Sequence, residues 1–151
     1  MPKRTKTVSS PSEQANLILR LYELRRETVM REARSYIGGE FLPRSADELV
    51  QIVTAGTRQS GFVLQVYGYW DMVAAFVTSG ALSSELVYDT CQELYFQFAK
   101  IQPYLPEFRK RMDLPEWMRS IETLGSLPSG KRRMAQMRNS IEAIQKLRAT
   151  K

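Results

Sequence analysis

Asp71 is the residue whose surroundings most clearly require a specific interaction, because it is the only charged side chain in the run from Gly61 to Leu82. A carboxylate in an apolar helix must be paired with a cation, protonated, or turned towards a cavity. The arginine-rich first helix offers Arg25 or Arg26 as the cation, which predicts an ion pair at the edge of the core. The alternative is a functional carboxylate that faces a pocket.

The sequence contains no histidine, and this removes several classes of enzyme. Ser-His and Cys-His nucleophiles, histidine general bases and histidine-containing zinc or di-iron sites all require the imidazole ring. Only carboxylate, lysine, tyrosine or arginine chemistry remains, and a pocket around Asp71, Tyr67 and Trp70 is where it would occur. We therefore predict no catalytic residues, no metal site and no cofactor.

A glycine-lysine motif at the C-terminal side resembles a phosphate-binding loop. Gly125, Gly130 and Lys131 match the first seven positions of G-x-x-x-x-G-K-[ST]. Arg132, however, occupies the position of the hydroxyl that would hold magnesium, and a helical pattern precedes the motif where a buried strand is required. We interpret the match as chance.

Three carboxylates recur at four-residue spacing and therefore share one face of a helix. They are Glu85, Asp89 and Glu93. Side chains of a single helix rarely complete a coordination sphere, and no calcium-binding loop accompanies them. We expect a solvated face, or a partner for a basic helix.

The segment 131–151 is predicted to form a basic amphipathic helix, because its apolar residues recur at the a and d positions of a heptad. Three uses fit this pattern: docking back on the bundle, pairing with another helix, or lying on nucleic acid or membrane. The regular apolar stripe favours docking or pairing. The candidate interaction residues are Met134, Met137, Ile141, Ile144, Lys131, Arg132, Arg133 and Arg138.

Positive charge is concentrated at the two ends of a chain whose net charge is +6. Residues 1–9 have no apolar periodicity, and we expect a disordered basic tail there. Residues 130–151 hold seven lysines and arginines against a single carboxylate, Glu142. Basic ends of this kind attract nucleic acid or acidic partners, so nucleic-acid binding through the two terminal segments is the alternative function.

Capping signals and apolar periodicity predict helices along the rest of the chain, and no strand pattern occurs. Ser10 and Glu13 form a capping box for the first helix, and Gly38 follows it. Breaks at glycine and proline separate the later helices, with residues 125–130 forming a loop. The expected helices span residues 10–37, 45–55, 61–79, 83–101, 115–124 and 131–149, with a brief helix or turn at 107–112.

The central helix, residues 61–79, is apolar on nearly every side and should be surrounded by protein. A bilayer is disfavoured as its home because Asp71 at the midplane would cost about 2.5 to 3.5 kcal/mol. In this helix and in residues 83–101, apolar residues recur at alternating intervals of four and three residues, and we call each such row a seam. The two seams predict that the helices pair as an antiparallel hairpin. The seams are Phe62, Val66, Tyr69, Val73 and Phe76, and Val87, Cys91, Leu94, Phe98 and Ile101.

Three stretches, LYELRRETVMREAR, GYWDMVAAFVTSGAL and YFQFAKIQPYLPEFR, resemble a family of small bacterial all-helical proteins of unknown function. The likeness covers about residues 15–124. It includes an aromatic-acid pair, Trp70-Asp71, followed by an apolar run and a turn at Gly80-Ala81. The resemblance implies the helical fold and brings no catalytic residues with it.

These observations predict an all-α, single-domain, mainly antiparallel bundle of five to six helices, with its domain at residues 10–124 and a buried central helix at 61–79. A composition of 43% hydrophobic and 25% charged residues fits a globular protein. The lone Cys91 and the absence of a signal peptide predict a cytoplasmic location without a membrane span. We expect a non-enzymatic interaction or scaffold protein, whose C-terminal helix binds a protein partner or a second copy.

Overall fold

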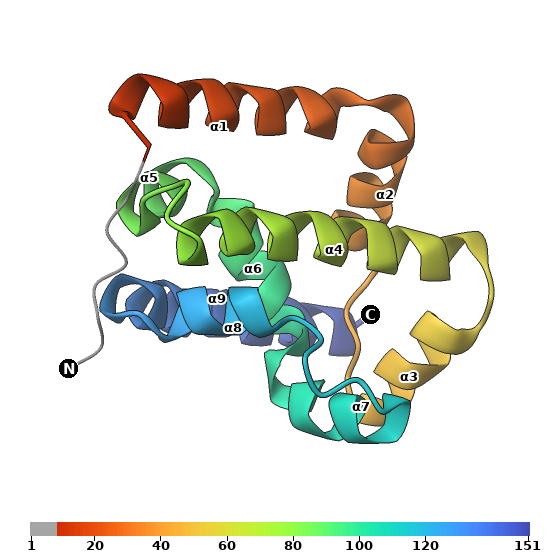
Figure 1. Ribbon diagram of the computed structural model, residues 1–151. Helices are drawn as coiled ribbons and strands as arrows, with labels where there is room; N and C mark the ends of the chain where they lie inside the picture. Colours follow the sequence, from red (N-terminus) through yellow and green to blue (C-terminus); the bar gives the residue numbers. More distant parts are fainter. Residues whose placement is uncertain (1–8) are drawn as a thin grey trace.

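Every regular element that the structure describes is a helix. The computed structural model describes residues 9–151, and no strand occurs among them, so the all-α prediction is confirmed. The predicted tail at residues 1–9 lies outside the described residues, apart from Ser9. The helices are more numerous than expected (Figure 1): α1 (Pro11–Arg26), α2 (Thr28–Gly39), α3 (Ala46–Thr54), α4 (Arg58–Thr78), α5 (Ser84–Thr90), α6 (Gln92–Ile101), a 3-10 turn η1 (Gln102–Tyr104), α7 (Leu105–Met112), α8 (Arg119–Ser126) and α9 (Pro128–Ala149).

The single helix predicted for residues 10–37 is wrong, because the chain bends at Glu27. Its start is confirmed, since Ser10 and Glu13 form the capping box of α1. Glu27 adopts an extended conformation (φ −56°, ψ 141°), and its side chain accepts a hydrogen bond from the Met30 N–H at 2.9 Å. Glu27 is both the C-cap of α1 and the N-cap of α2, so α2 leaves α1 at a steep angle (Figure 1).

The helix predicted for residues 83–101 is also interrupted, at Cys91. The backbone of Cys91 (φ −123°, ψ 53°) is not helical, and it separates α5 from α6. The break reorients the segment, and α6 packs chiefly against α9 and only slightly against α4. The expected hairpin between the central helix and residues 83–101 is therefore wrong.

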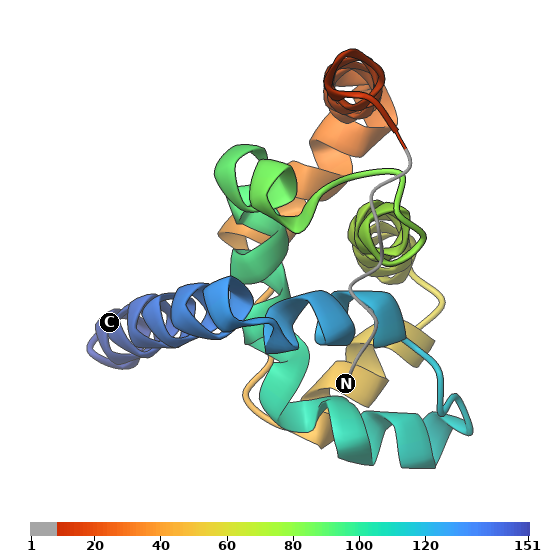
Figure 2. The same cartoon turned by 60° about the vertical axis from the view of Figure 1, so that its left-hand side comes forward.

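The central helix α4 lies between α2 and α8, which are its main neighbours. It begins with a capping box formed by Thr57 and Ser60, three residues earlier than predicted. Its axis is nearly aligned with that of α1, which runs beside it in the opposite direction (Figure 2). The Tyr69 hydroxyl joins the two helices by donating to the Leu21 carbonyl at 2.6 Å.

The buried face of α4 differs from the predicted seam. Of the five seam residues, only Val66 and Val73 are fully buried. Phe62, Tyr69 and Phe76 are half-buried, because α2 and α8 cover a different stripe of α4. The residues of α4 that complete this buried stripe are Val63, Tyr67, Trp70 and Ala74.

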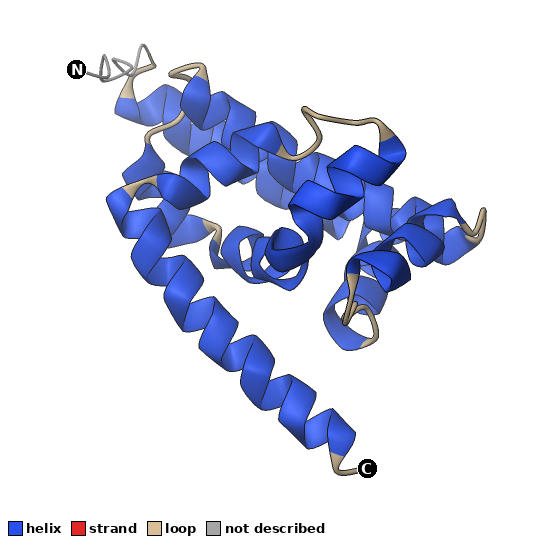
Figure 3. Cartoon of the chain, turned by 90° about the horizontal axis from the view of Figure 1, so that it is seen from below, coloured by secondary structure: helices blue, strands red, loops and turns tan. Residues whose placement is uncertain are grey.

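Residues 125–130, predicted as a loop, are helical except at Leu127, where α8 ends and α9 begins. Proline is tolerated at the first position of a helix, and Pro128 opens α9 there. The turn is tight, since a Cβ atom on Gly130 would lie 2.4 Å from the Leu124 carbonyl oxygen. The α9 helix then runs along α6 and α8 and extends along one side of the molecule (Figure 3).

Candidate functional site

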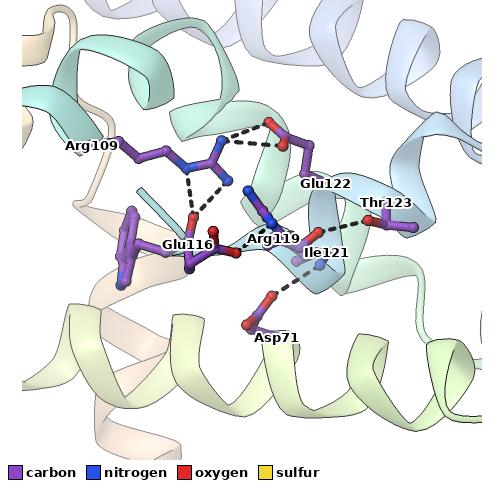
Figure 4. Close-up of polar contacts among 8 residues, drawn as sticks. Asp71, Arg109, Glu116, Arg119, Ile121, Glu122 and Thr123 are labelled. Carbon is purple, nitrogen blue, oxygen red and sulfur yellow. Dashed lines mark hydrogen bonds and ion pairs between the residues drawn. The ribbon is translucent and has the colours of Figure 1, made fainter. Parts of the chain in front are cut away.

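Asp71 caps the N-terminus of α8. Its Oδ1 atom accepts a hydrogen bond from the Ile121 N–H at 2.9 Å (Figure 4). The residue that precedes α8, Met118, has a left-handed backbone (φ 60°) and supplies no side-chain cap. The first N–H groups of a helix need acceptors, and the helix dipole favours a negative charge at that end. A carboxylate from α4 therefore completes a helix that begins forty-eight residues later in the chain.

The predicted ion pair between Asp71 and Arg25 or Arg26 does not form. Arg26 is exposed, and Arg25 lies over the rings of Tyr22 and Trp70, 3.9 Å and 5.2 Å from their centroids. Trp70 and Asp71 point about 100° apart around the helix, and Arg25 lies on the Trp70 side, 3.7 Å from the Glu93 carboxylate. Asp71 instead turns towards α8.

Burial is the main influence on the pKa of Asp71, and it raises that pKa above the ordinary value for an aspartate. The backbone N–H groups of Ile121 and Ser120 and the charge of Arg109 act in the opposite direction. The environment therefore stabilises the charged carboxylate less than water does. The hydrogen bonds of the cap and the nearby charge thus offset only part of the cost of burial.

Arg109 of α7 fixes the connection between α7 and α8. Its Nε and Nη2 atoms donate to the Trp117 carbonyl at 2.8 and 2.7 Å, and its Nη1 donates to both carboxylate oxygens of Glu122 at 3.1 Å (Figure 4). The connection starts and ends at left-handed residues, Asp113 (φ 53°) and Met118 (φ 60°). One guanidinium thus holds a tight, irregular segment against the first turn of α8.

A cleft of about 480 Å³ opens beside Asp71, lined by this residue and by residues 113–118. The lining combines carboxylates with apolar surface, including Leu114 and the half-buried Trp117. Tyr67 does not line it: this residue is fully buried, and its hydroxyl donates to the Gln97 carbonyl at 2.7 Å. The predicted pocket of Asp71, Tyr67 and Trp70 is therefore not formed.

An exposed apolar surface beside the cleft lies on α4 itself. Leu64 and Met72 are 49% and 37% exposed, and Gly61 and Gly68 on the same side are exposed as well. Together with Ala75 they form a strip without formal charge, which we call the outer strip. Asp71 follows Leu64 by seven residues, so the cleft adjoins the strip along one line of the helix. The prediction of a helix buried on every side is wrong for this face.

The apolar stripe predicted on the C-terminal helix faces the protein's own core. Met134 and Ile141 are buried, and Met137 and Ile144 are half-buried, because α9 packs against α6 and α8. Of the three uses considered for this helix, docking back on the bundle is the one that the described structure contains.

The basic residues of α9 divide into two groups. Arg133 is buried with its guanidinium carbon 3.9 Å from the centre of the Tyr88 ring, and Arg138 donates to the Gln102 side chain at 3.1 Å. Lys131, Arg132 and Arg138 are exposed, so Arg133 is the one of the four predicted basic residues that is buried.

An ionic cluster inside the fold joins Glu93 of the predicted acidic face to basic residues of α1 and α2. Arg34 donates through Nη2 and Nε to the two Glu93 carboxylate oxygens at 2.6 and 3.2 Å, and Arg25 lies 3.7 Å from the same carboxylate. Glu93 is thus engaged within the fold, whereas Glu85 and Asp89 of the predicted acidic face are exposed. The cluster ties α6 to α1 and α2, and the available signal was the basic face of residues 10–37.

The fold and these contacts define a single all-helical domain whose polar clusters brace helices against one another. The chain belongs to the family described as "Domain of unknown function (DUF4760)", whose sequence profile matches residues 10–126. The predicted membership of a family of unknown function is confirmed, while its bacterial nature stays a prediction. No curated protein and no solved structure matches the chain. Among the described residues, no helix combines the length and apolar character needed to cross a membrane.

Proposed function

We propose that this protein is a non-enzymatic interaction module whose binding surface is the outer strip of α4. The observation that carries the proposal is the exposure of Leu64 and Met72, 49% and 37%, on a strip whose own residues carry no formal charge and which Asp71 borders. Apolar side chains exposed singly are ordinary, but a continuous uncharged strip on the central helix is typical of a docking surface.

The glycines of the strip support the same function. Glycine inside a helix is less favourable than alanine by about 1 kcal/mol. A Cβ atom on Gly61 or Gly68 would meet no atom within 4 Å, so packing within the chain does not require glycine at either position. Glycine does allow the backbone of another molecule to approach closely. The strip has the composition of a surface against which a helix packs.

The C-terminal helix is a weaker candidate for the binding surface than the sequence suggested. Its buried residues, Met134 and Ile141, would have to leave the core before they could contact a partner. The nucleic-acid alternative also has less support, because Arg133 is stacked on tyrosine and Arg148 donates to the Gly39 carbonyl at 2.7 Å. Lys131, Arg132 and Arg138 are exposed, so this alternative retains part of the predicted basic surface but not Arg133.

Site-specific photo-crosslinking in the cells that naturally make the chain tests this function. A photoreactive amino acid at position 72 should give discrete crosslinked species, and the same group at position 147 should not. Leu147 is the matched control because it is 67% exposed on α9, away from the strip. The Leu64→Glu substitution should abolish the adducts formed from position 72. Equal labelling from both positions, or adducts that survive Leu64→Glu, would contradict the proposal.

A further inference from the structure

The outer strip of α4 has nearly the same pattern in both directions from its centre. Gly68 lies at the middle, and the large apolar residues Leu64 and Met72 lie four residues before and after it. The small residues Gly61 and Ala75 lie seven residues before and after it. Positions separated by three, four or seven residues share one side of a helix, so all five residues form one continuous surface.

We propose that the occupant of the outer strip is a second copy of this chain, whose α4 crosses in the antiparallel direction about a twofold axis at Gly68. The proposal rests on the proposed function, since both require the strip to be a binding surface. A twofold interface uses the same patch on both subunits and must be complementary to itself. The reversed spacing meets this condition, because it places Leu64 of one copy beside Met72 of the other and Gly61 opposite Ala75.

Steric and electrostatic features favour the same arrangement. Gly68 at the crossing point lets the two backbones come close, and the large side chains on either side then fill the space beside it. Antiparallel helices also place each N-terminus near the partly negative C-terminus of the other. The strip itself brings no like charges together.

The area available predicts a weak dimer. With 21 residues, α4 is about 32 Å long, and a contact about 10 Å wide covers about 300 Å² on each copy. A standard interface buries about 800 Å² on each partner, so flanking surface must contribute. The helices α1 and α8 lie on either side of α4 and are the flanks available (Figure 2). We expect a dissociation constant on the order of 10 to 100 µM.

Sedimentation velocity on the purified full chain, at concentrations from about 1 to 500 µM, tests the proposal. The wild-type chain should shift from monomer to dimer across this range. Met72→Glu and Gly68→Leu should each raise the dissociation constant at least tenfold. Gly68→Leu remains informative if the charged variant unfolds, since position 68 faces open space in the monomer. The controls Gly38→Leu and Leu147→Glu, at exposed positions on α2 and α9, should stay within twofold of wild type.

Disulfide trapping tests the antiparallel register. In a Cys91→Ala background, a mixture of Leu64→Cys and Met72→Cys chains should form more crosslinked dimer than either chain alone. A chain that stays monomeric at every concentration overturns the second-copy proposal, and crosslinks to another protein in cells would then leave the proposed function standing. A chain that stays monomeric and gives no crosslinks to another protein would overturn both the second-copy proposal and the proposed function. A dimer unaffected by the strip substitutions would also overturn the proposal, because another surface would then join the copies.

Discussion

The buried lysine of α6 should make the stability of the protein depend on pH in a predictable direction. Lys100 is 4% exposed, and its Nζ donates to the Ile37 carbonyl in the last turn of α2 at 2.6 Å. Burial lowers the pKa of Lys100 to about 8, and the positive charge of Arg148 adds to the effect while Glu93 opposes it. The ordinary lysine pKa is about 10.4, so ionised Lys100 costs the folded state about 3 kcal/mol at pH 7.

The direction of this pH dependence follows from the number of protons that the folded and unfolded states bind. Between pH 8 and about 10.4 the unfolded chain holds a proton on Lys100 that the folded chain has released, so the free energy of unfolding rises with pH. The slope should approach about 1.4 kcal/mol per pH unit in this window and vanish below it. Lys100→Met, which keeps the length of the side chain and cannot titrate, should lack this slope.

Urea denaturation followed by circular dichroism at pH 7, 8, 9 and 10 measures the difference. Tyr69 and Tyr95, whose burial raises their pKa values to about 12, titrate in both proteins and cancel when the two curves are subtracted. Lys110→Met, at an exposed position of α7, should retain the wild-type slope. Parallel curves for wild type and Lys100→Met would refute the reasoning, because they would mean that Lys100 holds its proton equally well in both states.

Substitutions at three further positions test features described above. Asp71→Ala should lower the free energy of unfolding by about 1 kcal/mol through loss of the α8 cap, whereas Asp71→Asn should cost less because its amide oxygen still accepts from the Ile121 N–H; urea denaturation measures both. Arg109→Gln should cost about 2 kcal/mol and make the connection at Trp117 more sensitive to limited proteolysis. Gly68→Ala should stabilise the monomer by about 0.5 to 1 kcal/mol, measured at low micromolar concentration by thermal unfolding.

Each of these expectations has an outcome that contradicts it. Equal losses for the alanine and asparagine variants would mean that Asp71 contributes through something other than its cap. Unchanged proteolysis of Arg109→Gln would remove the role assigned to that guanidinium. A less stable Gly68→Ala monomer would show that the chain itself needs glycine at that position.

Local signals in the sequence predicted where several helices begin. The capping box at Ser10 is such a signal, because the side chain that satisfies the first N–H groups is a neighbour in the chain. The bends at Glu27 and Cys91 carry neither glycine nor proline, and the periodic pattern continues through both of them. At these positions tertiary packing decides the backbone conformation, so the sequence pattern alone predicts helices that are too long.

The partner of Asp71 depended on a relation between distant segments. The sequence indicates that this carboxylate needs a partner, and charge alone suggested an arginine. A different clue lies before α8, where Met118 occupies a position that usually holds a serine, threonine, aspartate or asparagine. A helix that lacks a cap of its own must find an acceptor elsewhere, and Asp71 provides it. Which of several carboxylates would do so depends on the packing of α8 against α4.

Because α9 packs on the core, the end of the family match and the end of the packed structure fall at different residues. The family match ends at residue 126, whereas Met134 of α9 is buried and lies close to Gly125 at the end of α8. A chain cut at the family boundary would lack α9 and would expose the sides of α6 and α8 that α9 covers. The family match thus ends before the last helix that packs on the core. Expression of the matched segment alone would consequently produce a protein with an unfilled apolar trough along α6 and α8.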